Sequence, residues 1–123
     1  MPQADGFGED MAVARRALLA SDWTGARGAF ERAAAAGAGP GALEGLAQAA
    51  FMLNDPAVAI DARERAYAGY REAGQHVEAA RIAIALSWDY RAYRGEPAVS
   101  DGWLARARRL LADGPPTAEL GWL

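Results

Sequence analysis

The chain has 123 residues, which suits one ordinary domain with a real core and is too short for two independent ones. All 13 basic residues are arginine and cysteine is absent, so the composition excludes a P-loop lysine, a Schiff base, a thiol nucleophile, a disulfide and a thiolate metal site. The net charge of −3 provides no general attraction to nucleic acid or to anionic membranes.

The composition favours packed helices. Alanine, the residue with the best helix propensity, occupies 32 of the 123 positions, and no stretch alternates apolar and polar residues as a strand does. We therefore expect an all-α fold. Residues 1–8 are polar and contain glycine, so they are expected to form a flexible N-terminal tail, followed by a single helical-repeat domain over residues 9–123.

The first two predicted helices form a hairpin. Apolar residues at helical spacing begin after Glu9 and continue to a stop at Ser21, and Asp22 can cap a second helix that opens at Trp23. That helix ends at a glycine-rich loop over residues 37–41.

The third and fourth predicted helices form a second hairpin. The third follows the loop and is interrupted near Asn54, where Asp55 serves as the N-cap and Pro56 as the first residue of the fourth helix. The fourth helix runs to about residue 73, and Gly74 ends it in a left-handed cap position.

Two further helices are predicted over about residues 77–94 and 97–112. The first of them is apolar nearly all round and is expected to be the most buried helix. Residues 117–123 resemble the first two turns of a seventh helix with no stop signal behind them. The chain is therefore expected to be either a fragment of a longer protein or a stand-alone protein with a truncated terminal helix.

The second helices of the hairpins share a pattern of small residues. Ala26, Ala59 and Ser100 align at intervals of 33 and 41 residues, against a tetratricopeptide period of about 34. Two positions depart from that pattern, because Arg63 occupies a usually aromatic place and Trp88 a usually small one.

The segments LEGLA (43–47), ARERAY (62–67) and GWLARARRLL (102–111) carry a closer likeness. With them the chain resembles the tetratricopeptide-repeat (TPR) region of actinobacterial LuxR-type transcriptional regulators and related signalling proteins. The resemblance implies a right-handed stack of about three antiparallel helical hairpins, a TPR-like α-solenoid, plus the start of a terminal helix. It also implies that the repeats bind partner proteins, while a separate helix-turn-helix, absent from this sequence, binds DNA.

A solenoid of this kind presents a concave surface lined by the first helix of each hairpin. On that geometry the predicted partner-binding residues are Glu44, Gln48, Phe51, Arg81, Trp88 and Asp89. Four of them also have a structural interpretation: Phe51 and Trp88 as packing residues, Arg81 paired with Glu78, and Asp89 paired with an arginine such as Arg81 or Arg91.

Apolar residues near the C-terminus suggest self-association. Trp103, Leu120, Trp122 and Leu123 are expected to form an uncovered end of the stack, through which a homodimer could form. Arg106, Arg108 and Arg109 are the densest basic group and could touch phosphates, although a solvated helix face explains them more simply.

The main functional hypothesis is a scaffold that binds a protein or peptide, located in the cytoplasm, with no enzyme activity, no cofactor, no metal, no direct nucleic-acid contact and no membrane contact. The alternative is a small-molecule or peptide receptor with an aromatic pocket between hairpins, lined by Trp88, Tyr90, Tyr93 and Trp103. A third hypothesis is an enzyme that works through the carboxylate of Asp89. The one histidine, His76, is expected at a surface or capping position.

Overall fold

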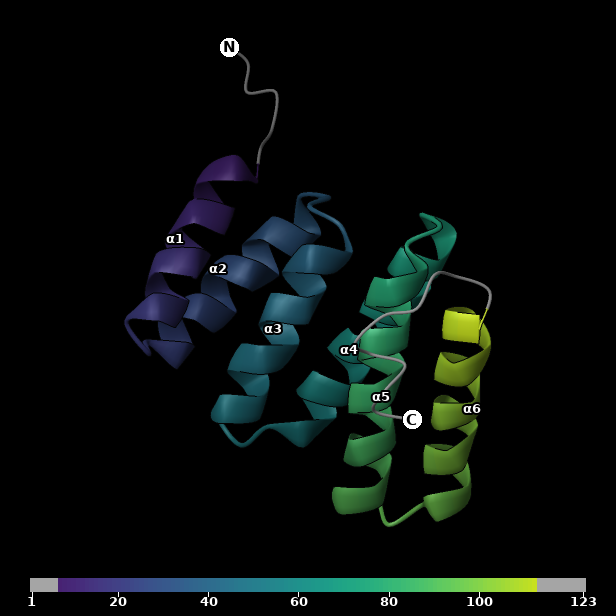
Figure 1. The fold of residues 1–123 in the computed structure, drawn as a ribbon. Helices are drawn as coiled ribbons and strands as arrows, with labels where there is room; N and C mark the ends of the chain where they lie inside the picture. The colour runs from purple at the N-terminus through teal and green to yellow at the C-terminus, as the bar shows by residue number, and fades with distance from the viewer. Residues whose placement is uncertain (1–6, 113–123) are drawn as a thin grey trace. The chain divides into compact units, whose positions relative to one another are not determined.

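The computed structural model of the chain describes residues 7–112, which form six helices and no strand (Figure 1). The helices are α1 (Gly8–Leu19), α2 (Trp23–Ala35), α3 (Pro40–Met52), α4 (Pro56–Glu72), α5 (His76–Ala92) and α6 (Pro97–Ala112). The all-α prediction is confirmed. None of these helices combines the length and the apolar character that crossing a bilayer requires.

The chain divides into two compact units, residues 1–62 and 63–123. α4 contributes its first part to one unit and the rest to the other, because the boundary lies between Ala62 and Arg63. The single domain over residues 9–123 stays a prediction.

The first four helices all end in the same local structure. The residue two positions beyond the helix has a positive φ in each case: Ser21, Gly37, Asn54 and Gly74. After α1, the amide of Ser21 donates to the carbonyl of Leu18 (3.0 Å) and the amide of Asp22 to that of Ala17 (2.8 Å). These two bonds define a Schellman motif, which satisfies the last carbonyls of a helix without help from the rest of the protein.

The helix starts also follow local rules. Asp22 accepts a hydrogen bond from the amide of Gly25 (3.0 Å), and Asp55 from the amide of Val58 (3.3 Å), so both predicted N-caps are present. α3 begins at Pro40, inside the stretch predicted as a loop, because proline is preorganised for the first helical position. α1 begins at Gly8, one residue earlier than predicted.

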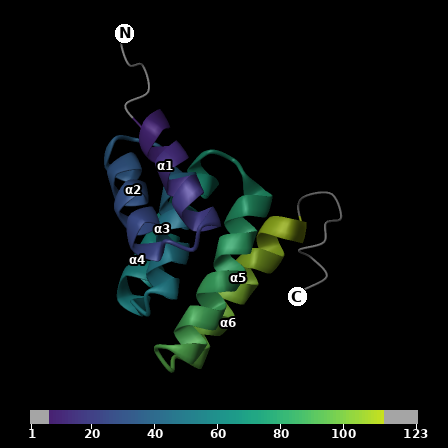
Figure 2. The ribbon, with the colours of Figure 1, turned by 90° about the vertical axis from the view of Figure 1, so that its left-hand side faces the viewer.

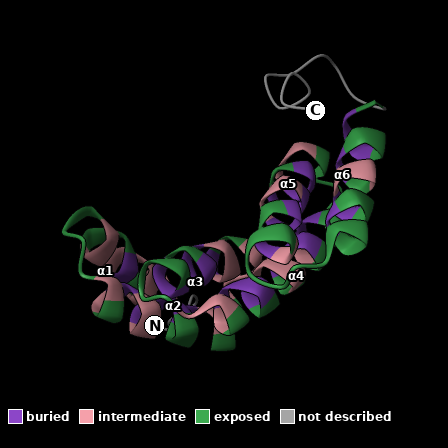
Figure 3. Cartoon of the chain, turned by 90° about the horizontal axis from the view of Figure 1, so that it is seen from below, coloured by how far each residue is buried: buried purple, intermediate pink, exposed green. Residues whose placement is uncertain are grey.

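In the first unit, α2 packs against both α1 and α3 through small side chains. Figure 3 shows buried residues along helix faces, and in this unit most of them are alanine. The largest side chain with almost no exposure is Phe30 on α2, whose ring lies against the backbone of Gly45 on α3. Alanine and glycine therefore allow these helices to approach closely.

In the second unit, α5 and α6 lie side by side as an antiparallel hairpin (Figures 1 and 2). Leu86, Leu111 and Trp103 are buried here, and the ring of Trp103 meets that of Tyr67 edge to face at 4.9 Å between centroids. α5 is not buried all round as predicted, since Arg81 and Trp88 are exposed.

Candidate functional site

A hollow of about 220 Å³ lies between α5 and α6. We call it the α5–α6 groove, and it is lined by Ile84, Ser87, Trp88, Arg91, Ser100 and Leu104. Its walls are mostly apolar, with two hydroxyls and one guanidinium. This composition is typical of sites that receive an apolar group and orient it with a few polar contacts.

Trp88 is the main exposed feature of this groove. It lies four residues after Ile84 on α5, so both side chains share one helix face, yet 68% of its surface is exposed. An indole is costly to leave in water, and buried tryptophans dominate the affinity of many protein interfaces. Trp88 is thus exposed on the surface of α5, and its role in partner binding stays a prediction.

The two hydroxyls of the groove differ in their hydrogen bonds. Ser87 donates to the carbonyl of Ile84 (2.6 Å). The hydroxyl of Ser100 is buried and has no hydrogen-bond partner among the described residues. An unsatisfied buried hydroxyl is unfavourable by about 1–3 kcal/mol, so a ligand that bonds to Ser100 gains an interaction that the protein alone does not provide.

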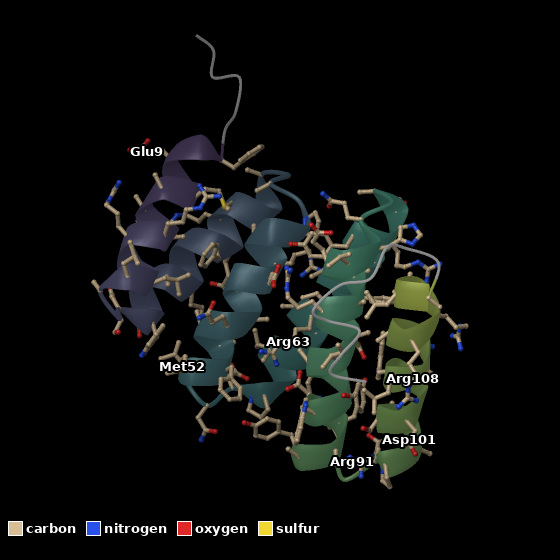
Figure 4. The ribbon with its side chains drawn as sticks, viewed as in Figure 1. Glu9, Met52, Arg63, Arg91, Asp101 and Arg108 are labelled. Atoms are coloured by element: carbon tan, nitrogen blue, oxygen red, sulfur yellow. The ribbon has the colours of Figure 1, made fainter. Side chains whose placement is uncertain are left out.

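One residue of the groove forms an ion pair near the turn between α5 and α6. Arg91 donates to Asp101 at 3.1 Å, and Figure 4 shows the two residues near that turn. Both side chains are more than half exposed, so the pair contributes little to stability. Moving the Arg91 side chain away from Asp101 to contact a bound group therefore costs little free energy.

Asp89 follows Trp88 but lies on the buried side of α5. Nη1 of Arg63 on α4 donates to both carboxylate oxygens of Asp89, at 2.8 and 2.6 Å, with only 5% of the Asp89 side chain exposed. The predicted pairing of Asp89 with an arginine is confirmed, but the partner is Arg63 on the neighbouring helix and not Arg81 or Arg91, which pairs with Asp101. The arrangement leaves Asp89 little surface for a partner protein and gives its carboxylate a structural ion pair.

A second polar contact joins α4 and α5 at the next residue. The hydroxyl of Tyr90 donates to a carboxylate oxygen of Glu64. This hydrogen bond, together with partial burial and the negative charge of Glu64, raises the pKa of Tyr90 from 10.0 to about 12.

The raised pKa of Tyr90 predicts a loss of stability at high pH. Folding favours the neutral phenol, so its contribution is complete below pH 10 and disappears as the pH rises from about 10 to about 12. Phenolate absorbance should show a titration step at about pH 12, and Tyr90→Phe should remove that step. Glu64→Gln, which retains a hydrogen-bond acceptor without charge, should move the step back toward 10; an unchanged step would refute the assignment.

The predicted residues of α3 lie in the first unit. Glu44, Gln48 and Phe51 follow one another at i, i+4 and i+7, so they share one face of the helix, and Gln48 and Phe51 are exposed. Glu44 is partly buried. On α5, Arg81 and Trp88 share an exposed face in the same way. Their role in partner binding stays a prediction.

Three of the aromatic residues predicted to line a receptor pocket have different contacts in the structure. Trp88 lines the α5–α6 groove, Tyr90 bonds to Glu64, and Trp103 packs on Tyr67. Trp103 is also the one described member of the predicted self-association surface, and only 8% of it is exposed. Leu120, Trp122 and Leu123 lie outside the described residues.

Sequence reasoning identified Trp88 but not the rest of the groove. Ile84, Ser100 and Leu104 look like ordinary members of amphipathic helices, and only the register of α5 against α6 brings them together. The one available signal was Ser100, a polar residue at a position where the repeat pattern requires a buried small one.

No family model, curated protein or solved structure matches this chain. The likeness to tetratricopeptide regions of regulators therefore remains a prediction from the sequence.

Proposed function

We propose that this chain is a protein-interaction module that binds a segment of a partner protein in the α5–α6 groove, with Trp88 as the anchor. The observation that carries the proposal is the exposure of Trp88, 68% of whose surface is accessible, beside the hydroxyl of Ser100, which has no hydrogen-bond partner within residues 7–112. Tryptophan is enriched among residues that dominate interface affinity.

The size of the groove favours a peptide over a small molecule. At about 220 Å³ it is smaller than the roughly 300 to 1,000 Å³ of pockets that enclose drug-sized ligands. A peptide needs to insert only one side chain, while its backbone can hydrogen-bond to a serine hydroxyl. The receptor alternative has less support, because of its four aromatic residues only Trp88 lines this groove.

The repeated helix ends support the wider proposal of a helical-repeat scaffold. Ser21 and Asn54, which close the turns after α1 and α3, are 33 residues apart and both have positive φ, matching the interval between Ala26 and Ala59. We propose that the hairpins stack as a right-handed tetratricopeptide-like solenoid. By resemblance, this would be the sensory or partner-binding region of a bacterial signalling or transcriptional regulator.

The test is a selection of peptides from a random phage-displayed library on the purified chain, followed by affinity measurements with synthetic peptides. Trp88→Ala should weaken selected peptides about 30-fold, which corresponds to the roughly 2 kcal/mol of a hot-spot residue. Ser100→Ala should weaken them while leaving the chain as stable as before or more so, because it removes an unsatisfied hydroxyl.

Leu19→Ala is the matched control. Leu19 on α1 is an even more exposed apolar residue, at 89%, and it lies outside the groove. Its loss should leave peptide affinity unchanged. Peptides that bind Trp88→Ala as tightly as the parent chain would show that the groove is not the binding surface.

A further inference from the structure

Three arginines gather at the end of the α5–α6 hairpin where α5 begins and α6 ends. They surround a second hollow of about 260 Å³, which we call the arginine hollow and which is lined by Tyr67, Arg71, His76, Arg106, Arg109 and Leu110. None of these lining residues is acidic. The arginine hollow shares no residue with the α5–α6 groove, so the two proposed binding sites do not overlap.

An aromatic pair positions two of these arginines. Nη1 of Arg71 donates to the hydroxyl of Tyr67 (3.1 Å), and the guanidinium of Arg106 lies 4.3 Å from the ring centroid of Trp103. Tyr67 and Trp103 are buried and in edge-to-face contact. Stacking on an aromatic ring uses the face of a guanidinium and leaves the N–H groups along its edge available for a ligand. Because these contacts already position the arginine side chains, ligand binding costs less conformational entropy.

The three arginines of the hollow differ from four other arginines of the chain in their ion pairs. Arg27, Arg32, Arg63 and Arg91 each form an ion pair with an aspartate. Within residues 7–112, no carboxylate forms an ion pair with Arg71, Arg106 or Arg109. In a chain of net charge −3, this hollow is therefore a local concentration of positive charge that no carboxylate of residues 7–112 pairs with.

The start of α5 adds hydrogen-bond donors at the same place. His76 is the first residue of this 17-residue helix, and the preceding Gln75 provides no side-chain cap. The first amides of an uncapped helix lack intrahelical acceptors, and the helix dipole favours an anion near them. The start of α5 therefore favours an anion, as the three arginines do.

We propose that the arginine hollow binds a phosphoryl group, as a pyrophosphate-type anion or a phosphate monoester. Three guanidiniums supply planar N–H edges that match the oxygens of a phosphoryl dianion. Their total positive charge exceeds the negative charge of a single carboxylate, which favours an anion of higher charge. Arg106 and Arg109 extend from α6 at i and i+3, so both reach one ligand from the same side, while Arg71 reaches it from α4.

The test is calorimetric titration of the full chain with pyrophosphate and, separately, with phosphoserine. Arg106→Gln and Arg109→Gln should each weaken binding about tenfold or more, since each removes charge-assisted hydrogen bonds. Both arginines are exposed, and glutamine retains helix propensity, so the variants should fold. Tighter binding of pyrophosphate would identify a free polyphosphate as the ligand, and tighter binding of phosphoserine a phosphorylated side chain.

Arg108→Gln is the matched control. Arg108 lies between the two site arginines on α6 but does not line the hollow, so its replacement changes the net charge equally and should alter affinity less than twofold. An equal loss in all three variants would overturn the proposal, because it would show attraction to the whole basic helix. Absence of binding to both probes, or a preference for an oligonucleotide with the same loss in Arg108→Gln, would overturn it too.

Discussion

Asp89→Ala is expected to lower the free energy of unfolding by about 3 to 5 kcal/mol, the usual effect of removing one member of a buried ion pair. The carboxylate of Asp89 is almost fully buried, and Arg63, at 17% exposure, would lose the acceptor that now receives two hydrogen bonds. Urea denaturation followed by circular dichroism measures the change.

Two comparisons separate the buried pair from charge in general. Asp101→Ala also breaks an arginine–aspartate pair, but that pair is exposed and its loss should lower stability by less than about 1 kcal/mol. The double variant Arg63→Met/Asp89→Leu should recover most of the stability, because apolar groups of similar size can replace a buried pair. A single-variant effect as small as that of Asp101→Ala would mean that Asp89 is solvated.

Phe30→Ala should also destabilise the chain by about 3 to 5 kcal/mol, since Phe30 is the largest almost fully buried side chain of an otherwise alanine-rich unit. The neighbouring alanines are too short to refill the space, so a cavity would remain. Urea denaturation measures this change as well.

The contact of Phe30 with Gly45 can be tested by measuring the effect of Gly45→Ala on stability with and without the Phe30 ring. A Cβ placed on Gly45 would lie closer than 3.0 Å to three atoms of the Phe30 ring, so Gly45→Ala should destabilise the parent chain. In the Phe30→Ala background the ring is gone, and the same change should stabilise by about 0.5–1 kcal/mol through helix propensity. Gly102→Ala, where a Cβ meets nothing within 4 Å, should be favourable in both backgrounds.

The helix ends were predictable because local chemistry determines them. Asp22, Asp55, Pro56 and Gly74 each act on amides or carbonyls within a few residues, so the sequence around them contains the whole explanation. The start of α3 at Pro40 also has a local cause, because proline favours the first helical position. The glycines around it led to the wrong prediction of a loop there.

The side-chain contacts between helices were not predictable in this way. Arg63 and Glu64 meet Asp89 and Tyr90 across 26 residues, a register that depends on how α4 packs against α5. Pairing Asp89 with Arg81 or Arg91 assumed a partner from its own helix, whereas the buried side of α5 faces another element. The arginine hollow was predicted only in part for a related reason: Arg106 and Arg109 were noted as a basic group on one helix, but Arg71 and His76 lie on other helices, and only the packing brings them beside that group.

The alanine-rich packing of the first unit has a consequence for how this sequence can change over generations. A single base substitution converts an alanine codon to valine, threonine, serine, proline, glycine, aspartate or glutamate. At a fully buried helical position these replacements add bulk, bury a polar group or a charge, or weaken the helix. The positions affected include Ala14, Ala26, Ala29, Ala33, Ala42, Ala47 and Ala49. Drift at these positions should therefore be slow, and sequence variation should accumulate on the exposed faces, where a partner surface can diversify while the helices keep their spacing.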